Sequence, residues 1–120
     1  MIGKLKALFS QQGALSAVDA KHALDTGSVL VDVRGHGEWQ AGHAPQAIHI
    51  PLAQLTRRLA ELPADREIIT VCRSGHRSAV AAGLLRRHKR RASNLTGGMN
   101  AWAAAGLPIV TDRGTPGQVA

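Results

Sequence analysis

The only cysteine of the 120-residue chain, Cys72, stands between a strand-like run and a helix-forming run. Residues 67–71 before it are mostly β-branched, whereas residues 79–85 after it are mostly Ala and Leu, which favour a helix. Residues 72–78 between the two runs read Cys-Arg-Ser-Gly-His-Arg-Ser. A thiol at the end of a strand and at the N-terminus of a helix is typical of a reactive sulfur.

A thiol must lose its proton to act as a nucleophile, and a free cysteine has a pKa of about 8.5. Lowering that pKa to about 6.5 requires about 2.7 kcal/mol of preferential thiolate stabilisation. A helix N-terminus contributes about 0.3–2 kcal/mol, and backbone N–H groups curled around the sulfur add charge-assisted hydrogen bonds. Arg73 and Arg77 add two permanent positive charges. We therefore expect Cys72 to be an anionic nucleophile rather than an inert core thiol.

The remaining residues of this loop fit the same purpose. Gly75 permits a positive φ, so that successive N–H groups point inward. Ser78 is a favourable residue for capping the N-terminus of the following helix. Ser74 and His76 offer side-chain hydrogen bonds at the mouth of the loop, with a place on the rim as the alternative for His76.

The composition favours a small anionic substrate over a nucleic acid. The net charge is +7, but the densest basic run, residues 86–91, falls where the helix after Cys72 should end, and cations are favourable there. One Phe, two Trp and no Tyr leave few rings on which bases could stack. We expect no nucleic-acid partner.

A lone cysteine cannot form an internal disulfide, which argues against a disulfide-stapled secreted domain. Residues 1–9 begin like a signal peptide, but the polar residues 10–12 interrupt the apolar run. No run is long enough to span a bilayer. We expect a cytoplasmic monomer without stable membrane association. The six His show no metal-ligand spacing, and we expect neither a metal nor a cofactor.

Strand-like and helix-like segments alternate, which indicates an α/β domain with a mostly parallel sheet covered on both faces. Ser16 and Asp19 have the spacing of a helix cap. The pattern predicts helices at 17–24, 54–62, 78–88 and 99–105, strands at 29–33, 47–50, 67–71 and 92–95, a loop at 34–42, and frayed residues after 112.

Three ordered motifs resemble the rhodanese family of sulfurtransferases, from about Ser16 to Val110. The resemblance implies a rhodanese domain at 15–111, with three layers, α/β/α, around a five-stranded sheet. The residues outside it predict a lead-in segment at 1–14 and a flexible tail at 112–120. The motifs are Val31-Asp32-Val33-Arg34 with Glu38, Trp39 and residues 42–51; the loop 72–78; and residues 94–102 with Gly106-Leu107-Pro108-Ile109.

The resemblance implies that Cys72 takes the outer sulfur of thiosulfate or a low-molecular-weight persulfide and carries it as a persulfide. Cyanide, a thiol or a protein thiol then accepts the sulfur. The backbone amides of residues 73–78 would form an anion cradle, and the side chains of Arg73 and Arg77 would steer the donor. Asp32 and Arg34, at the carboxyl end of their strand, would support the site as an ion pair.

Two other functions are compatible with the loop. Phosphatases and arsenate reductases of related fold place an arginine six residues after the cysteine, but here Ser78 is the sixth residue and Arg77 the fifth. The shorter loop favours sulfur over a larger tetrahedral anion. The other alternative is a carrier module that receives sulfur from one protein and delivers it to another, with little turnover of small molecules.

Overall fold

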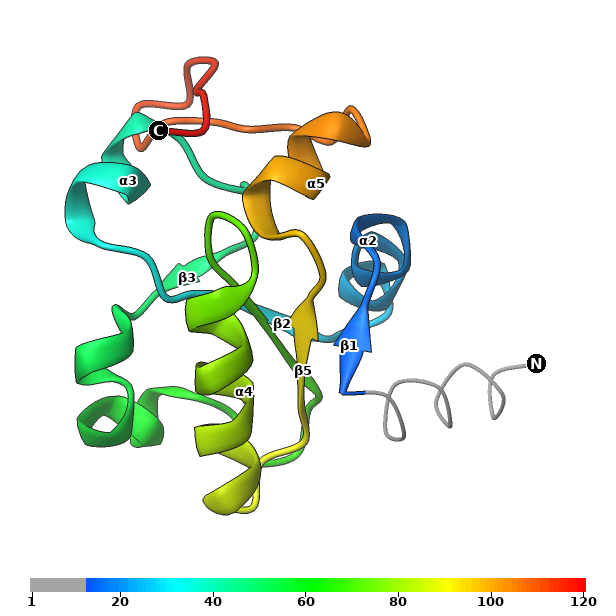
Figure 1. Cartoon of the computed structure of the whole chain (residues 1–120), viewed down its shortest axis with the longest axis vertical. Coiled ribbons are helices and arrows are strands. Elements are labelled where there is room, and N and C mark those ends of the chain that lie inside the picture. The colour runs from blue at the N-terminus through cyan, green and yellow to red at the C-terminus, as the bar shows by residue number, and fades with distance from the viewer. Residues whose placement is uncertain (1–12) are drawn as a thin grey trace.

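The structure, a computed structural model, describes residues 13–120, so that most of the expected lead-in segment lies outside the described residues. Its five strands form one parallel sheet in the order β1-β5-β4-β2-β3 (Figure 1). The strands are β1 (Ala14–Leu15), β2 (Val29–Asp32), β3 (Ile48–His49), β4 (Ile68–Val71) and β5 (Ala92–Leu95). The helices are α2 (Ala17–Asp25), α3 (His36–Ala41), α4 (His76–Arg87), α5 (Gly98–Ala104) and the 3₁₀ helices η1 (Leu52–Gln54) and η2 (Thr56–Glu61).

The α/β fold with a parallel sheet is confirmed, and each side of the sheet carries a hydrophobic cluster. Successive strand residues point to opposite faces, so Ile69 and Val71 of β4 join one cluster while Ile68 joins the other. The first cluster packs under α2 and α5, and the second packs under α4 and the 3₁₀ helices. Burial on both faces explains why β2 and β4 are almost continuously apolar.

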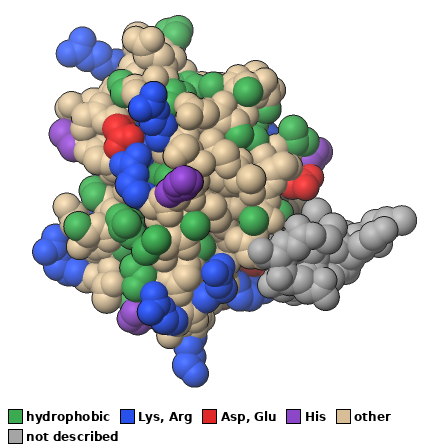
Figure 2. Space-filling view, viewed as in Figure 1, with side chains coloured by type: hydrophobic (Ala, Val, Ile, Leu, Met, Phe, Trp, Pro, Cys, Tyr) green, Lys and Arg blue, Asp and Glu red, His purple; other side chains and the backbone are tan. Residues whose placement is uncertain are grey.

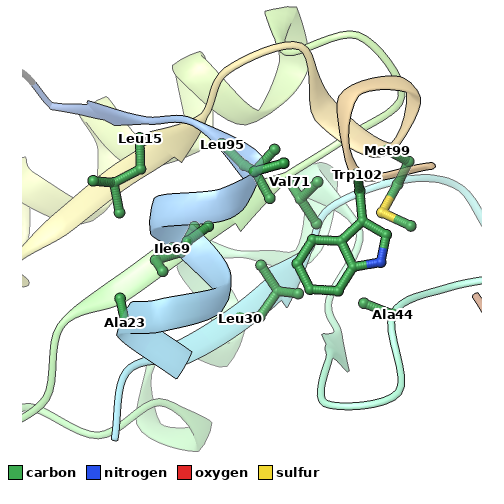
Figure 3. Packing of buried hydrophobic residues seen from close by; sticks show 11 residues of the cluster. Leu15, Ala23, Leu30, Ala44, Ile69, Val71, Leu95, Met99 and Trp102 are labelled. Atoms are coloured by element: carbon green, nitrogen blue, oxygen red, sulfur yellow. The ribbon is translucent and has the colours of Figure 1, made fainter. Parts of the chain in front are cut away.

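Trp102 of α5 is the largest fully buried side chain and anchors the first cluster. Its indole lies among Met99, Leu30, Val71 and Ala44 (Figure 3). Its ring N–H donates a hydrogen bond of 2.8 Å to the carbonyl oxygen of Pro108, so no buried donor is left unpaired there. This packing fixes the position of α5, whose first residues lie against the Cys72 loop.

The helix after Ser16 is confirmed, since the Asp19 amide donates to the Ser16 hydroxyl at 3.1 Å. The strand β1 before it was not predicted, because two residues carry no recognisable alternation. It pairs with β5 at the edge of the sheet.

The prediction of a loop at 34–42 was wrong, because residues 36–41 form α3. The two glycines at its ends, Gly35 and Gly42, flank the helix instead of breaking it. The Glu38 carboxylate accepts a hydrogen bond from the Gly35 amide at 3.1 Å, which satisfies one of the free amides at the helix start.

The single helix predicted at 54–62 is instead divided between the two 3₁₀ helices η1 and η2. Arg58 has a non-helical backbone, with φ −111° and ψ 20°, so a continuous helix does not form. The leucine pattern was nevertheless informative, since Leu55 and Leu62 are buried in the second cluster.

The C-terminal residues, expected to form a flexible tail, make backbone hydrogen bonds to the domain. The Gln118 amide donates to the Ala41 carbonyl at 3.0 Å, and the Gly117 amide donates to the Ile109 carbonyl at 2.9 Å. In Figure 1 the C-terminus lies beside α3. A side chain at Gly42 would collide with the Gln118 backbone, so this close approach requires glycine.

Asp32 and Arg34 form an ion pair of which neither side chain is exposed. Nη2 of Arg34 lies 2.8 Å from the Asp32 carboxylate and also donates to the Gly42 carbonyl at 2.7 Å. The Arg34 Nη1 is buried and has no hydrogen-bond partner among residues 13–120. A buried charged side chain is stable only when its charged partner is present, because no water solvates it.

Substituting Asp32→Ala therefore leaves a buried guanidinium unpaired, and we expect the free energy of unfolding to fall by about 3–5 kcal/mol. Urea unfolding followed by circular dichroism measures this loss. Asp25→Ala, which breaks the exposed Lys21–Asp25 pair of 2.7 Å, is the matched control and should change stability by less than about 0.5 kcal/mol. Equal effects of the two substitutions would contradict this account.

Candidate functional site

Cys72 follows directly after β4, a central strand, and a short turn connects it to α4. The prediction that Ser78 caps this helix was wrong, because α4 begins at His76 with Gly75 as its N-cap. Gly75 has a φ of 110°, which a residue with a side chain rarely adopts. The tight turn places Ser78 inside the first helical turn, where its hydroxyl faces Cys72.

Amide and hydroxyl donors of Gly75 and Ser78 lie around the sulfur of Cys72. The amide of Gly75 donates to Sγ at 3.1 Å and the amide of Ser78 at 3.4 Å, while the Ser78 hydroxyl oxygen lies 3.3 Å away. Burial raises the pKa of the thiol, but hydrogen bonds from Ser78, Gly75 and the Ser74 amide outweigh it, so that the pKa is lowered overall. The inward-pointing amides expected from the sequence are thus present.

Cys72 is only 1% exposed and belongs to the second hydrophobic cluster. Burial alone fits an inert core thiol, but an inert thiol has no need of converging amide donors. Because almost no sulfur surface is open to water, a reagent reaches Sγ only when atoms of the loop move apart. Arg73, Ser74 and His76 are the exposed residues of this loop.

The start of α5 holds the backbone of the same loop. The amide of Met99 donates to the Cys72 carbonyl at 2.8 Å, and the amide of Asn100 donates to the Arg73 carbonyl at 3.1 Å. Gly98 has a φ of 60°, and a side chain there would collide with both carbonyl oxygens. The loop is thus held between the N-termini of two helices, α4 and α5.

Arg77 is paired with Glu38 of α3, 39 residues away in the sequence. Its two terminal nitrogens lie 2.6 and 2.9 Å from the carboxylate oxygens, a two-point contact. The hydrogen bond to Glu38 raises the pKa of Arg77 and exceeds the effect of burial, and the nearby sulfur of Cys72 acts in the same direction. We expected the Arg77 side chain to steer the sulfur donor, but in the structure it is bound to the Glu38 carboxylate.

Sequence reasoning did not assign a role at the site to two residues, Glu38 and Asn94. Glu38 belongs to the first motif, but nothing in its spacing indicated a pairing with Arg77. Asn94 of β5 accepts a hydrogen bond of 2.5 Å from the Ser78 hydroxyl. Its amide nitrogen donates to the Gly75 carbonyl at 3.1 Å. The alternation along β5 places Asn94 on the same face as Ala92, which packs under α4.

Within residues 13–120, the side chains of Asp32 and Arg34 make no hydrogen bond with the sulfur loop, residues 72–78. Instead, the positive charge of Arg34 helps to lower the pKa of Glu38. The carbonyl oxygen of Arg34 lies 2.8 Å from a ring nitrogen of His49. The pair therefore supports the segment that carries Glu38 rather than Cys72 itself.

The surroundings are electropositive. Lys and Arg side chains are spread widely over the face in Figure 2, and Asp and Glu side chains are sparse there. Within residues 13–120, no three His, Cys, Asp or Glu side chains come together as a metal site would require. No helix in this range is long and apolar enough to cross a membrane. The arrangement suits nucleophilic attack by sulfur on an anionic compound.

Glu38→Gln tests the ion pair with Arg77. The hydrogen bond from Arg77 is the largest cause that lowers the pKa of Glu38 from 4.5 to about 2, although burial opposes it. Folding therefore favours the ionised carboxylate. The stabilising contribution of Glu38 is then full above about pH 5 and is lost as the pH falls towards about 2. Since the Arg77 side chain is 42% exposed, we expect about 1–2 kcal/mol at pH 7.

Urea unfolding of the protein and the variant between pH 3 and pH 8 measures this difference. Glu61→Gln, which breaks the surface pair with Arg58, is the control and should have a smaller effect that salt abolishes. A difference between protein and Glu38→Gln that stays constant down to pH 3 would contradict the assignment.

Comparison with known proteins identifies the fold and the family. The model of the rhodanese-like domain matches residues 16–105. The chain is 44% identical to a sulfurtransferase of Allochromatium vinosum over 72% of this chain and 81% of that protein. It is 42% identical to the HTH-type transcriptional regulator Rv0324 of Mycobacterium tuberculosis over 91% of this chain, and this match spans about half (49%) of the regulator.

A putative sulfur carrier protein of Bacillus subtilis, YrkF, is 33% identical over 74% of this chain and 49% of its own length. Among solved structures, a rhodanese-related protein from Thermoplasma volcanium superposes with a TM-score of 0.75 at 27% identity. That match covers 81% of this chain and 96% of the other. The resemblance found in the three motifs is confirmed: the chain belongs to the family of rhodanese-like domains.

Proposed function

We propose that this protein is a sulfurtransferase that carries a sulfane sulfur on Cys72 between a small anionic donor and a thiophilic acceptor. The convergence of the Gly75 and Ser78 amides on Sγ is the observation that supports this proposal most directly. These donors favour a negatively charged sulfur.

In the first step, the Cys72 thiolate attacks the outer sulfur of thiosulfate or of a low-molecular-weight persulfide. A new S–S bond forms to Cys72, and the donor's own bond to that sulfur breaks. The bonding electrons leave with sulfite, or with the thiolate of the persulfide donor. The protein then holds a Cys72 persulfide with its negative charge on the terminal sulfur, within the field of the α4 N-terminus.

In the second step, cyanide, a low-molecular-weight thiolate or a protein thiolate attacks the terminal sulfur. The electrons of the cleaved S–S bond return to Sγ, which regenerates the Cys72 thiolate. Two half-reactions through one covalent intermediate predict ping-pong kinetics. No cofactor enters either step.

The loop residues have distinct roles in this proposal. Arg73 is exposed and free to steer an anionic donor, together with Ser74 and His76 at the mouth. Arg77, held by Glu38, contributes fixed positive charge near Sγ rather than a mobile contact. A cytoplasmic location and a monomeric state stay predictions.

Intact mass spectrometry after incubation with thiosulfate tests the proposal. We expect the protein to gain the mass of one sulfur atom, because Cys72 is the only cysteine in the sequence. Cyanide or a thiol should remove the added sulfur. Cys72→Ala is the matched control and should gain nothing. A protein that gains no sulfur from thiosulfate or any persulfide, while hydrolysing an aryl phosphate, would favour the phosphatase alternative.

A protein-to-protein sulfur carrier is the second candidate, favoured by the similarity to YrkF and by the nearly complete burial of Sγ. A sulfur that opens only on contact with a partner would turn over free thiosulfate slowly. The protein loaded with a radiolabelled terminal sulfur and then incubated with a lysate separates the two candidates, because the label moves to the acceptor whose thiolate attacks that sulfur. One dominant labelled protein with slow thiosulfate turnover indicates a carrier, whereas fast turnover without a dominant labelled protein indicates a free-standing enzyme.

A further inference from the structure

Asn94 contacts Gly75 and Ser78, two of the residues that donate to the sulfur of Cys72. Its side-chain oxygen lies 2.5 Å from the Ser78 hydroxyl, and its side-chain nitrogen lies 3.1 Å from the Gly75 carbonyl. Ser78 is fully buried and Asn94 is partly buried. Asn94 belongs to β5, the strand next to β4, so its backbone is fixed by the sheet independently of the Cys72 loop.

The two contacts of Asn94 fix the direction of its amide group. A carbonyl oxygen only accepts hydrogen bonds, so the group facing Gly75 must be the amide nitrogen, which donates. The amide oxygen therefore faces Ser78. Because that oxygen also only accepts, the Ser78 hydroxyl must donate its hydrogen to Asn94 in this arrangement.

A serine hydroxyl has a single hydrogen, and two acceptors compete for the one on Ser78. Asn94 Oδ1 is 2.5 Å away and Cys72 Sγ is 3.3 Å away. While the hydrogen lies towards Asn94, a lone pair of the hydroxyl faces the sulfur, which suits a protonated thiol donating to it. A thiolate needs the hydrogen itself, and the hydroxyl must then turn away from Asn94.

We propose that Asn94 is a positioning residue that competes with Cys72 for the hydroxyl hydrogen of Ser78. The chain from thiol to hydroxyl to amide stabilises the protonated cysteine, and ionisation of Cys72 turns the Ser78 hydroxyl from Asn94 to the sulfur. The same turn would accompany each change of charge on Sγ during sulfur transfer, and in that respect the inference rests on the proposed function.

The contact between Asn94 and Gly75 contributes less to the effect of Asn94 on Cys72 ionisation than the contact with Ser78 does. The Gly75 carbonyl also accepts a hydrogen bond of 3.1 Å from the Ala79 amide, the first backbone bond of α4. Loss of the Asn94 nitrogen therefore leaves Gly75 anchored, with its own amide still directed at Sγ. Removal of Asn94 then acts chiefly by releasing the Ser78 hydroxyl.

The pH dependence of the rate of Cys72 alkylation by iodoacetamide tests the proposal without any sulfur-transfer assay. We expect Asn94→Ala to lower the apparent pKa of Cys72 by about one unit, because the released hydroxyl donates freely to the thiolate. Ser78→Ala should raise it by about one unit. In the double variant, Asn94→Ala should have no further effect, because the hydroxyl through which it acts is gone.

Asn94→Leu, which fills the space of the amide, guards against a folding defect in Asn94→Ala and should shift the pKa in the same direction. Gln46→Ala, which removes an exposed amide, is the matched control and should leave the pKa unchanged. Thermal unfolding verifies that each variant is folded. An unchanged or raised pKa in folded Asn94→Ala and Asn94→Leu would overturn the proposal, as would an equal shift with and without Ser78.

The proposed function and the proposed role of Asn94 can be refuted independently of each other. If the pKa shifts appear but the protein gains no sulfur from any donor, the competition for the hydroxyl stands and the sulfurtransferase proposal falls. If sulfur is gained but the shifts are absent, only the role of Asn94 is refuted.

Discussion

The site depends on one constraint: a sulfur removed from water must receive its hydrogen bonds from the protein. At the end of β4, only a turn with a positive φ brings amides back onto the side chain that precedes it, and Gly75 provides that turn. The sheet fixes one side of the sulfur and the N-terminus of α4 fixes the other. Burial, which alone would keep the thiol protonated, thereby strengthens the hydrogen bonds that favour its ionised form.

The rest of the fold can be understood as support for this turn. The start of α5 binds the carbonyls of Cys72 and Arg73, and the buried Trp102 holds α5 in place. On the opposite side, Glu38 binds Arg77 and so connects α3 to the first turn of α4. The loop is therefore held through its carbonyls, which leaves its amides free to face the sulfur. An anion cradle requires this division between the two kinds of backbone group.

Sequence reasoning was most successful where the signal was local. The strand, the turn and the helix around Cys72 follow one another within about twenty residues, and each carries its own pattern. Where glycines flank a short helix, as at α3, the same rules predicted a loop. Contacts between distant segments were not predictable: Glu38 and Arg77 are 39 residues apart, and Ser78 and Asn94 are 16 apart. Only the register of the folded sheet and the packing of α3 bring these side chains together.

The capping of α4 by Gly75 rather than by Ser78 has a chemical consequence. If Ser78 capped α4, its hydroxyl oxygen would accept a hydrogen bond from a backbone amide of the helix. Because Gly75 takes the capping position, the hydroxyl of Ser78 is released and lies between a sulfur and an amide oxygen. One group with one hydrogen can serve the protonated thiol as an acceptor and the thiolate as a donor. A site that must hold both charge states of sulfur in turn therefore gains more from this hydroxyl than from a further fixed amide.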